Sequence, residues 1–166
     1  MIIGPPGSGK SEGARQLAAL TGLPVVHTDQ IFWTPGWVQR DQAAREGLAR
    51  AAAEEDAWII EGGIAATWDI RLSRADTVIH FDTPLGLRVW RIFFRTLRYY
   101  GRTRADLAEG CPERFDPVFW RYIWTTRRSQ RIRYEAACAR ARDSGICDVH
   151  VFRTRRAWDR WLATRR

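Results

Sequence analysis

The 166-residue sequence predicts an α/β protein with three layers, in which a five-stranded parallel sheet carries helices on both faces. Short apolar runs alternate with helical segments along the chain, which is the pattern of parallel strands joined by crossover helices. A glycine-rich loop joins the first apolar run to the first helical segment. No linker is long enough to separate two domains, so we expect a single domain over residues 1–166.

The predicted strands are short apolar runs, because strands that are buried on both faces carry few polar side chains. They cover residues 1–3, 23–27, 58–60, 75–81 and 147–152. The predicted helices have apolar residues at helical spacing or many alanines, and three of them begin at proline or aspartate. They run from the glycine-rich loop to about residue 20, from about 41 to 55, from 84 to about 100, from 116 to about 141 and from 157 to 164.

The composition excludes several classes of protein. Hydrophobic residues make up 45% of the chain, which is enough for a packed core. No apolar stretch reaches about 18 residues, so we expect no membrane-spanning helix, and residues 1–30 lack the pattern of a secretory signal. The three cysteines form no CxxC pair, which fits a reducing compartment. We therefore expect a cytoplasmic protein without a membrane partner.

The net charge of +8 is concentrated in one segment. Between Arg88 and Arg133 there are 12 arginines and four acidic residues, whereas the rest of the chain is neutral. Arg91, Arg95 and Arg98 follow Arg88 at helical spacing and form one basic stripe with it. This segment should face polyanions, either the phosphates of a nucleotide or those of a nucleic acid.

Residues 4–11 read Gly-Pro-Pro-Gly-Ser-Gly-Lys-Ser, a complete GxxxxGK[ST] motif between a predicted strand and a predicted helix. Glycines let backbone amides wrap around phosphate oxygens, and the helix start adds a partial positive charge. We expect Lys10, the only lysine, to reach the phosphates of ATP, and Ser11 to bind Mg²⁺. The motif predicts a P-loop fold of the nucleotide-kinase type. The expected cofactor-binding residues are Gly4, Pro5, Pro6, Gly7, Ser8, Gly9, Lys10 and Ser11.

Carboxylates follow three predicted strands, at the edge of the sheet where α/β proteins bind ligands. Glu61 is our first choice for the acid on the metal side, and Asp29 for the acid that addresses the phosphoryl acceptor. Asp82 also ends an apolar strand, where P-loop proteins commonly place a metal-side acid. It has an equal claim to cap the helix that begins at Pro84, so both roles stay open.

The arginine-rich segment, about residues 88–133, is predicted to form a helical lid that closes over phosphates. We expect four of its arginines to stabilise the transferred charge, and we expect others to belong to a solvated basic surface. The four are Arg95, Arg102, Arg104 and Arg128.

Aromatic residues and histidines allow weaker predictions. Trp33 and Trp37 follow Asp29, where they either stack on a ligand or pack against the protein. The three histidines lie on predicted strands and are expected to be packed rather than catalytic. Four residues at helical spacing are expected to belong to the core, and they are Phe119, Trp120, Ile123 and Trp124.

Taken together, these motifs resemble the small P-loop proteins known as DNA topology modulation proteins, which are related to adenylate kinase. The resemblance spans nearly the whole chain and is carried by residues 4–11, 27–29, 32–33, 35–37, 58–62, 74–79, 101–104 and 110–114. It implies a nucleotide-kinase-like fold, ATP and Mg²⁺ as cofactors, and an arginine-bearing lid. The chain departs from the family pattern at Glu12, where threonine is usual, and at residues 61–64, where Asp-Gly-Asn-Tyr is usual.

The favoured function is therefore an ATP-dependent kinase that transfers the γ-phosphate to a nucleotide, a nucleoside or another small acceptor. A nucleotide-regulated DNA-binding protein is the second reading, because the basic segment would also attract nucleic acid. A third reading is an ATP-binding protein without turnover, which Glu12 and Gly63 would explain.

Overall fold

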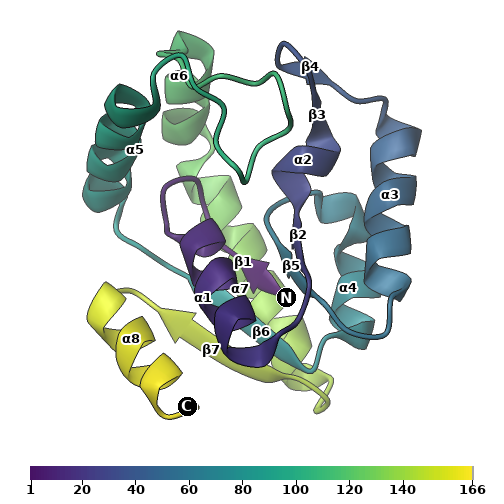
Figure 1. Cartoon of the computed structure of the whole chain (residues 1–166). Coiled ribbons are helices and arrows are strands. Elements are labelled where there is room, and N and C mark those ends of the chain that lie inside the picture. Colours follow the sequence, from purple (N-terminus) through teal and green to yellow (C-terminus); the bar gives the residue numbers. More distant parts are fainter. Residues whose placement is uncertain (166) are drawn as a thin grey trace.

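The computed structural model describes residues 1–165 and contains a five-stranded sheet in which every pairing is parallel. The strands lie in the order β2 (Val25–His27), β5 (Ile59–Glu61), β1 (Ile2–Ile3), β6 (Thr77–Phe81) and β7 (Asp148–Phe152) (Figure 1). The first strand of the chain is therefore the central one, which brings the loop that follows it to the middle of the sheet edge. The predicted α/β class, the five parallel strands and the helices on both faces are confirmed.

The two residues of β1 point to opposite faces of the sheet, because side chains alternate along a strand. Ile3 belongs to a buried cluster that includes residues of α4 (Trp68–Arg74) and α7 (Arg127–Asp143). Ile2 belongs to a second cluster with residues of α1 (Lys10–Thr21) and α8 (Arg155–Ala163). The sheet is thus covered on both sides, and only its edges remain available for ligands.

The long helix that the sequence predicts over residues 116–141 is two helices, α6 (Pro117–Thr125) and α7. The hydroxyls of Thr125 and Thr126 donate hydrogen bonds to the carbonyls of Arg121 (2.9 Å) and Tyr122 (2.7 Å). Threonine hydroxyls that donate to carbonyls of the preceding turn bend a helix, and β-branched residues have a low helix propensity. The pair of threonines therefore accounts for the break that hydrophobic periodicity did not reveal.

The remaining predicted helices are α3 (Gln42–Glu54) and α5 (Leu85–Tyr99), and both are present. Five further elements were not predicted, because each is only two to seven residues long. They are α2 (Thr28–Phe32), the antiparallel hairpin of β3 (Trp33–Thr34) and β4 (Val38–Gln39), η1 (Ala65–Thr67) and α4.

The prediction of a core cluster on α6 is wrong in part. Ile123 is buried, and Phe119 and Trp120 are half-buried, but Trp124 is 58% exposed. The indole of Trp124 lies beneath the guanidinium of Arg127 at 4.9 Å, which is a cation–π contact at the surface rather than core packing. Within residues 1–165, no helix has the length and apolar character that a membrane-spanning segment needs.

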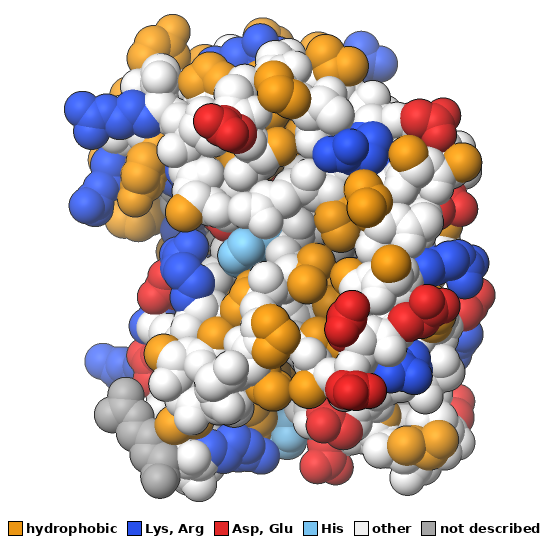
Figure 2. Space-filling model, turned by 45° about the vertical axis from the view of Figure 1, so that its right-hand side comes forward, with side chains coloured by type: hydrophobic (Ala, Val, Ile, Leu, Met, Phe, Trp, Pro, Cys, Tyr) orange, Lys and Arg blue, Asp and Glu red, His pale blue; other side chains and the backbone are white. Residues whose placement is uncertain are grey.

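The surface is divided by charge. On the face drawn in Figure 2, the left edge carries mainly basic side chains, and acidic side chains are more frequent at the right and lower right. On helix α5, Arg91 turns toward the glycine-rich loop and Arg95 toward loop 101–116, while Trp90 and Phe94 stay exposed.

Candidate active site

The glycine-rich loop, residues 4–9, joins β1 to α1 and is built for close backbone approach. A Cβ atom at Gly4 would lie 2.7 Å from the carbonyl oxygen of Phe81, and one at Gly7 would lie 2.8 Å from that of Arg88. Both residues have positive φ, which side chains disfavour. No side chain caps α1, so the amides of its first turn are free to meet an anion.

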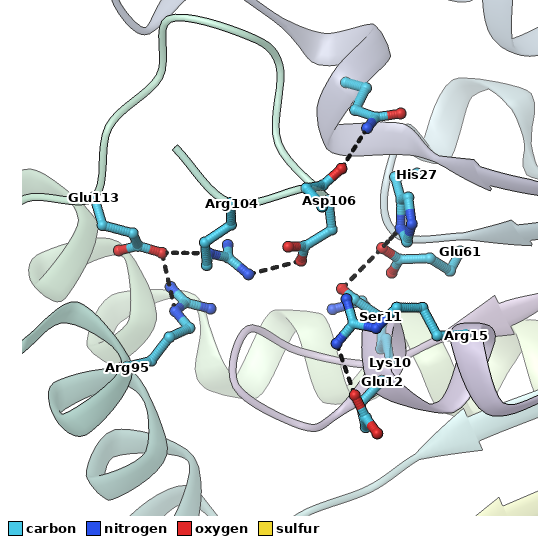
Figure 3. Close-up of polar contacts among 12 residues, drawn as sticks. Lys10, Ser11, Glu12, Arg15, His27, Glu61, Arg95, Arg104, Asp106 and Glu113 are labelled. Carbon is cyan, nitrogen blue, oxygen red and sulfur yellow. Dashed lines mark hydrogen bonds and ion pairs between the residues drawn. The ribbon is translucent and has the colours of Figure 1, made fainter. Parts of the chain in front are cut away.

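Ser11 and Glu61 meet at the start of α1. The Ser11 hydroxyl donates a 2.9 Å hydrogen bond to Glu61 Oε1, and His27 Nδ1 lies 2.8 Å from the same oxygen (Figure 3). Glu61 is only 3% exposed. Burial opposes its ionisation, but the hydrogen bond from His27 and the positive charge of Lys10 outweigh burial and lower the pKa of Glu61. Glu61 is therefore an ionised carboxylate.

Loop 101–116, which joins α5 to α6, lies opposite this pair and holds an ionic network (Figure 3). Arg104 donates through Nε to Glu113 Oε1 at 2.7 Å and through Nη1 to Asp106 Oδ2 at 2.6 Å. Arg95 of α5 pairs with Glu113 at 3.0 Å. Asp106 and Glu113 are each 5% exposed, so the network is enclosed by protein. Arg95 and Arg104 are thereby held in place by acidic partners, on the side of the site opposite Ser11 and Glu61.

Asp29 lies in the first turn of α2, between these two groups. Its side chain is exposed to solvent, although neighbouring protein groups remove part of its hydration. This dehydration, and then repulsion from Glu61, raise the pKa of Asp29, which Lys10 opposes. Within residues 1–165 its carboxylate accepts no side-chain or backbone hydrogen bond, so it is free to accept one from a ligand.

Loop 101–116 is fastened to the segment that follows Asp29. Four hydrogen bonds join them, and all four are accepted by backbone carbonyls. In three of them the donor is a side chain, and in the fourth it is a backbone amide. They run from Gln30 Nε2 to Ala105 O (2.8 Å), from the Gly36 amide to Gly110 O (2.8 Å), from Trp37 Nε1 to Pro112 O (2.9 Å) and from Cys111 Sγ to Thr34 O (3.3 Å). Trp37 also meets Trp33 edge to face at 5.4 Å, so both indoles serve packing. The arginine network and Asp29 are therefore positioned by one connected unit.

The loop that follows Glu61 is supported from below by Arg71 of α4. Arg71 is fully buried, and its guanidinium donates to the carbonyls of Gly63 (2.9 Å), Ile60 (3.3 Å) and Gly62 (3.4 Å). Burial lowers the pKa of Arg71 to about 10, so it is still charged at neutral pH and attracts Glu61. Arg71 is a positioning residue for the loop and for Glu61.

Replacing Arg71 with alanine should therefore destabilise the protein strongly. The variant loses three hydrogen bonds and leaves buried carbonyls without donors, which together should lower the free energy of unfolding by about 3 kcal/mol or more. Urea unfolding followed by circular dichroism measures this. Arg140→Ala is the control, because Arg140 makes an exposed pair with Asp69 (2.7 Å) that should contribute at most about 1 kcal/mol. Equal losses in the two variants would contradict a supporting role for Arg71.

The structure thus brings most of the predicted site residues together. Lys10, whose Nζ lies 3.4 Å from the carbonyl of Pro5, shares the region with Ser11, Glu61 and Asp29. From the opposite side, loop 101–116 and α5 bring Arg95 and Arg104 to the same region.

The other predicted residues lie elsewhere. Arg102 is exposed, and its side chain forms no hydrogen bond or ion pair within the described residues. Arg128 lines a different pocket on α7. Asp82 pairs with Arg153 at 3.0 Å and makes no cap for α5, so the predicted cap is wrong, and its role as a metal-side acid stays a prediction. Glu12 is held within α1 by Arg15 and Gln16, at 2.7 and 3.0 Å.

Sequence reasoning missed His27, Asp106, Glu113 and Arg71. His27 was expected to be packed, because a histidine within a strand gives no sign that its ring meets a carboxylate on the neighbouring strand. Its position two residues before Asp29, at the end of a strand, was the available signal. Asp106 and Glu113 lie in a loop whose path only the tertiary structure defines. The other histidines, His80 and His150, are packed against aromatic rings as predicted.

The oxygens of Ser11 and Glu61 fit a magnesium site. Hard cations prefer such ligands, and the 2.9 Å between the two oxygens equals the separation of about 3 Å between neighbouring ligands of an octahedral ion with bonds of about 2.1 Å. Within residues 1–165, no group of three or more His, Cys, Asp or Glu side chains is placed to hold a metal ion. Mg²⁺ would therefore depend on these two residues, water and the phosphates of a ligand.

Comparison of the sequence with models of known protein families and with curated proteins found no match in either.

Proposed function

We propose that this protein is an ATP-dependent kinase with P-loop architecture that phosphorylates a small acceptor. The observation that carries the proposal is that three chemically different groups lie in one region. They are the free amides with Lys10, the Ser11–Glu61 pair, and the arginines of loop 101–116. The first group suits phosphate binding, the second suits Mg²⁺, and the third suits the charge that a transferred phosphoryl group carries.

In this proposal each residue has one task. Lys10 and the amides of residues 7–11 hold the β- and γ-phosphates, and Ser11 and Glu61 hold Mg²⁺, which neutralises phosphate charge when it is bound. Asp29 accepts the proton of the attacking acceptor hydroxyl, for which its raised pKa suits it. Arg104 uses only two of its five N–H donors in the observed ion pairs, so others are free for phosphate oxygens.

Loop 101–116 acts as the lid in this mechanism, with Arg95 and Arg104 as its phosphate contacts. Asp106 and Glu113 keep both guanidinium groups in place before phosphate arrives. Holding charged donors in a fixed position reduces the reorganisation that the reaction would otherwise require. The lid also excludes water, which favours transfer to the acceptor over hydrolysis of ATP.

The test is a phosphoryl-transfer assay with ATP and Mg²⁺ against a panel of nucleotides, nucleosides and small alcohols. We expect one class of acceptor to be phosphorylated by the wild-type protein and none by Lys10→Ala. Arg15→Ala is the matched control, because Arg15 lies on the same helix and is half-exposed, beyond the phosphate-binding turn. Absence of ATP binding together with absence of transfer to every acceptor would contradict the proposal. ATP binding without transfer would instead favour the reading without turnover.

A nucleotide-regulated DNA-binding protein is the second candidate, and the exposed arginines of α6 and α7 favour it. Arg121 and Arg128 are exposed, and Arg128 has no partner within the described residues. This function requires binding of duplex DNA that weakens steeply as salt increases. Adding ATP discriminates between the two candidates, because under the kinase proposal the nucleotide should compete with DNA for the same arginines.

A further inference from the structure

A second group of arginines lines a pocket outside the candidate active site. The pocket lies between the beginning of α5 and α7, beside Pro5 of the glycine-rich loop, and has a volume of about 280 Å³. Its wall includes Arg88 of α5 and Arg127, Arg128 and Arg131 of α7. Asp82 is the one carboxylate among the lining residues, and it is already paired with Arg153. The pocket therefore carries a strong excess of positive charge.

Arg88 is the unusual member of this group. It is only 5% exposed, and within residues 1–165 its guanidinium forms no hydrogen bond and no ion pair. The Nε atom is completely enclosed without a partner. Burial lowers the pKa of Arg88, but a guanidinium remains protonated in proteins at neutral pH. Asp82 attracts the Arg88 guanidinium but pairs with Arg153, so within the described residues this buried permanent charge has no direct partner, which is unfavourable.

The other arginines differ in how far they are already engaged. Arg127 donates to the carbonyl of Trp124 and lies over the ring of that residue, and Arg131 pairs with Glu135 at 2.8 Å. Arg128 is exposed and has no partner within the described residues. Two uncommitted guanidinium groups from different helices, those of Arg88 and Arg128, thus line one pocket.

We infer that this pocket is a second anion site, which takes a phosphate or diphosphate group between α5 and α7. Guanidinium groups pair with phosphate oxygens in two parallel hydrogen bonds, and several of them around one cavity suit an anion of more than one charge. The volume of about 280 Å³ is large enough for a phosphate or diphosphate group.

The site differs in chemistry from the glycine-rich loop, which offers backbone amides and Lys10. The two are joined by Thr83, which lines the pocket and donates a 3.0 Å hydrogen bond from its hydroxyl to the carbonyl of Ser8. An anion in the pocket would link α5 to α7 at the point where the wall of the pocket meets the glycine-rich loop. The inference does not rest on the proposed kinase activity, because none of the residues assigned to that reaction supplies the two guanidinium groups.

Binding of inorganic pyrophosphate to the Lys10→Ala protein tests the inference by calorimetry in phosphate-free buffer. Lys10→Ala weakens phosphate binding by the glycine-rich loop and leaves the second pocket unchanged. We expect saturable binding that becomes tenfold weaker or more when Arg128→Met is added, because a charge-assisted pair is lost. Arg140→Met, an exposed position of α7 outside the pocket, should leave binding unchanged. Loss of all binding in Lys10→Ala, or equal binding by the Arg128 and Arg140 variants, would overturn the inference.

Arg88→Met provides a second, independent test by thermal unfolding. Without an anion the variant should unfold at the same temperature as the wild type or higher, because an apolar side chain replaces an unpaired buried charge. It should also lose the rise in unfolding temperature that pyrophosphate causes in the Lys10→Ala protein. A clearly lower unfolding temperature in phosphate-free buffer would show that the guanidinium is structural, and would contradict the anion site.

The source of the phosphate group is decided by competition in the same background. A short DNA duplex that displaces pyrophosphate, and does so less well in Arg128→Met than in Arg140→Met, assigns the site to backbone phosphates. Pyrophosphate that stays bound in the presence of duplex assigns the site to small phosphate compounds. Either result supports a phosphate site, and the absence of pyrophosphate binding at this pocket overturns it.

Discussion

Arg104→Met is expected to lower kcat for phosphoryl transfer by about 10³-fold or more, the effect of losing an arginine that stabilises transferred charge. Arg104 is the most constrained arginine of loop 101–116, held by Glu113 at 2.7 Å and Asp106 at 2.6 Å, with its side chain 14% exposed. A side chain fixed in this way can meet developing charge without reorganising. Initial rates at saturating ATP and acceptor measure the loss. The ATP dissociation constant should change far less, because the amides and Lys10 supply ground-state binding.

The matched control is Arg102→Met, two residues away on the same loop. Arg102 is exposed and has no side-chain partner within the described residues, so its loss should leave kcat nearly unchanged. Arg104→Lys keeps the charge but loses the guanidinium fork, and should recover little activity. Because Asp106 and Glu113 lose a partner in Arg104→Met, circular dichroism must first establish that the variant is folded. Equal kcat values for the Arg102 and Arg104 variants would refute the assignment.

Asp29→Asn is expected to lower kcat by about 10²- to 10⁴-fold, the usual contribution of a general base. Partial dehydration and the neighbouring Glu61 raise the pKa of Asp29 above its ordinary value of 3.8. As pH falls through this raised pKa the base becomes protonated, so wild-type kcat should decline at a higher pH than an ordinary aspartate would cause. The variant should be slow throughout and should lack that decline. A pH–rate profile for both proteins measures this.

The raised pKa of Asp29 should also affect the stability of the folded protein. A carboxyl group whose pKa is raised by folding favours the folded state below its unfolded pKa, and this contribution is lost as pH rises through the folded pKa. At neutral pH the ionised Asp29 therefore opposes folding, and Asp29→Asn should unfold at a higher urea concentration than the wild type. Asp143→Asn, at an exposed position, is the control for both measurements. An active Asp29→Asn protein, or one less stable than the wild type at pH 7, would contradict the proposed base.

Much of the fold follows from local pattern. Apolar runs such as Trp58–Ile60 and Ala75–Phe81 have no alternation, which indicates strands covered on both faces, and the glycine-rich motif indicates the loop between the first strand and helix. The hydrophobic pattern is less informative where side-chain hydrogen bonds to the backbone compete with a regular helix. The helix break at Thr126 arises from hydroxyl bonds to the preceding turn, which leave hydrophobic periodicity unchanged.

The residues of the candidate site also fall into those that the sequence predicts and those that it does not. Lys10, Ser11, Asp29 and Glu61 could be predicted because they end strands or begin a helix, and parallel strands bring such positions to one edge of the sheet. The partners of Arg104 could not, because Asp106 and Glu113 belong to a loop that no regular repeat constrains. For the same reason, sequence gave no way to choose Arg104 over the exposed Arg102.

By itself, then, the sequence determined the α/β class, the glycine-rich loop and the concentration of positive charge between Arg88 and Arg133, since each depends on residues close together in the chain. Only the tertiary structure decided how that charge is used. Arg95 and Arg104 pair with Glu113 in the network of the candidate active site, whereas Arg88 and Arg128 line a separate pocket. The physical reason is that a guanidinium's role is set by its burial and its partners, and these come from segments remote in sequence.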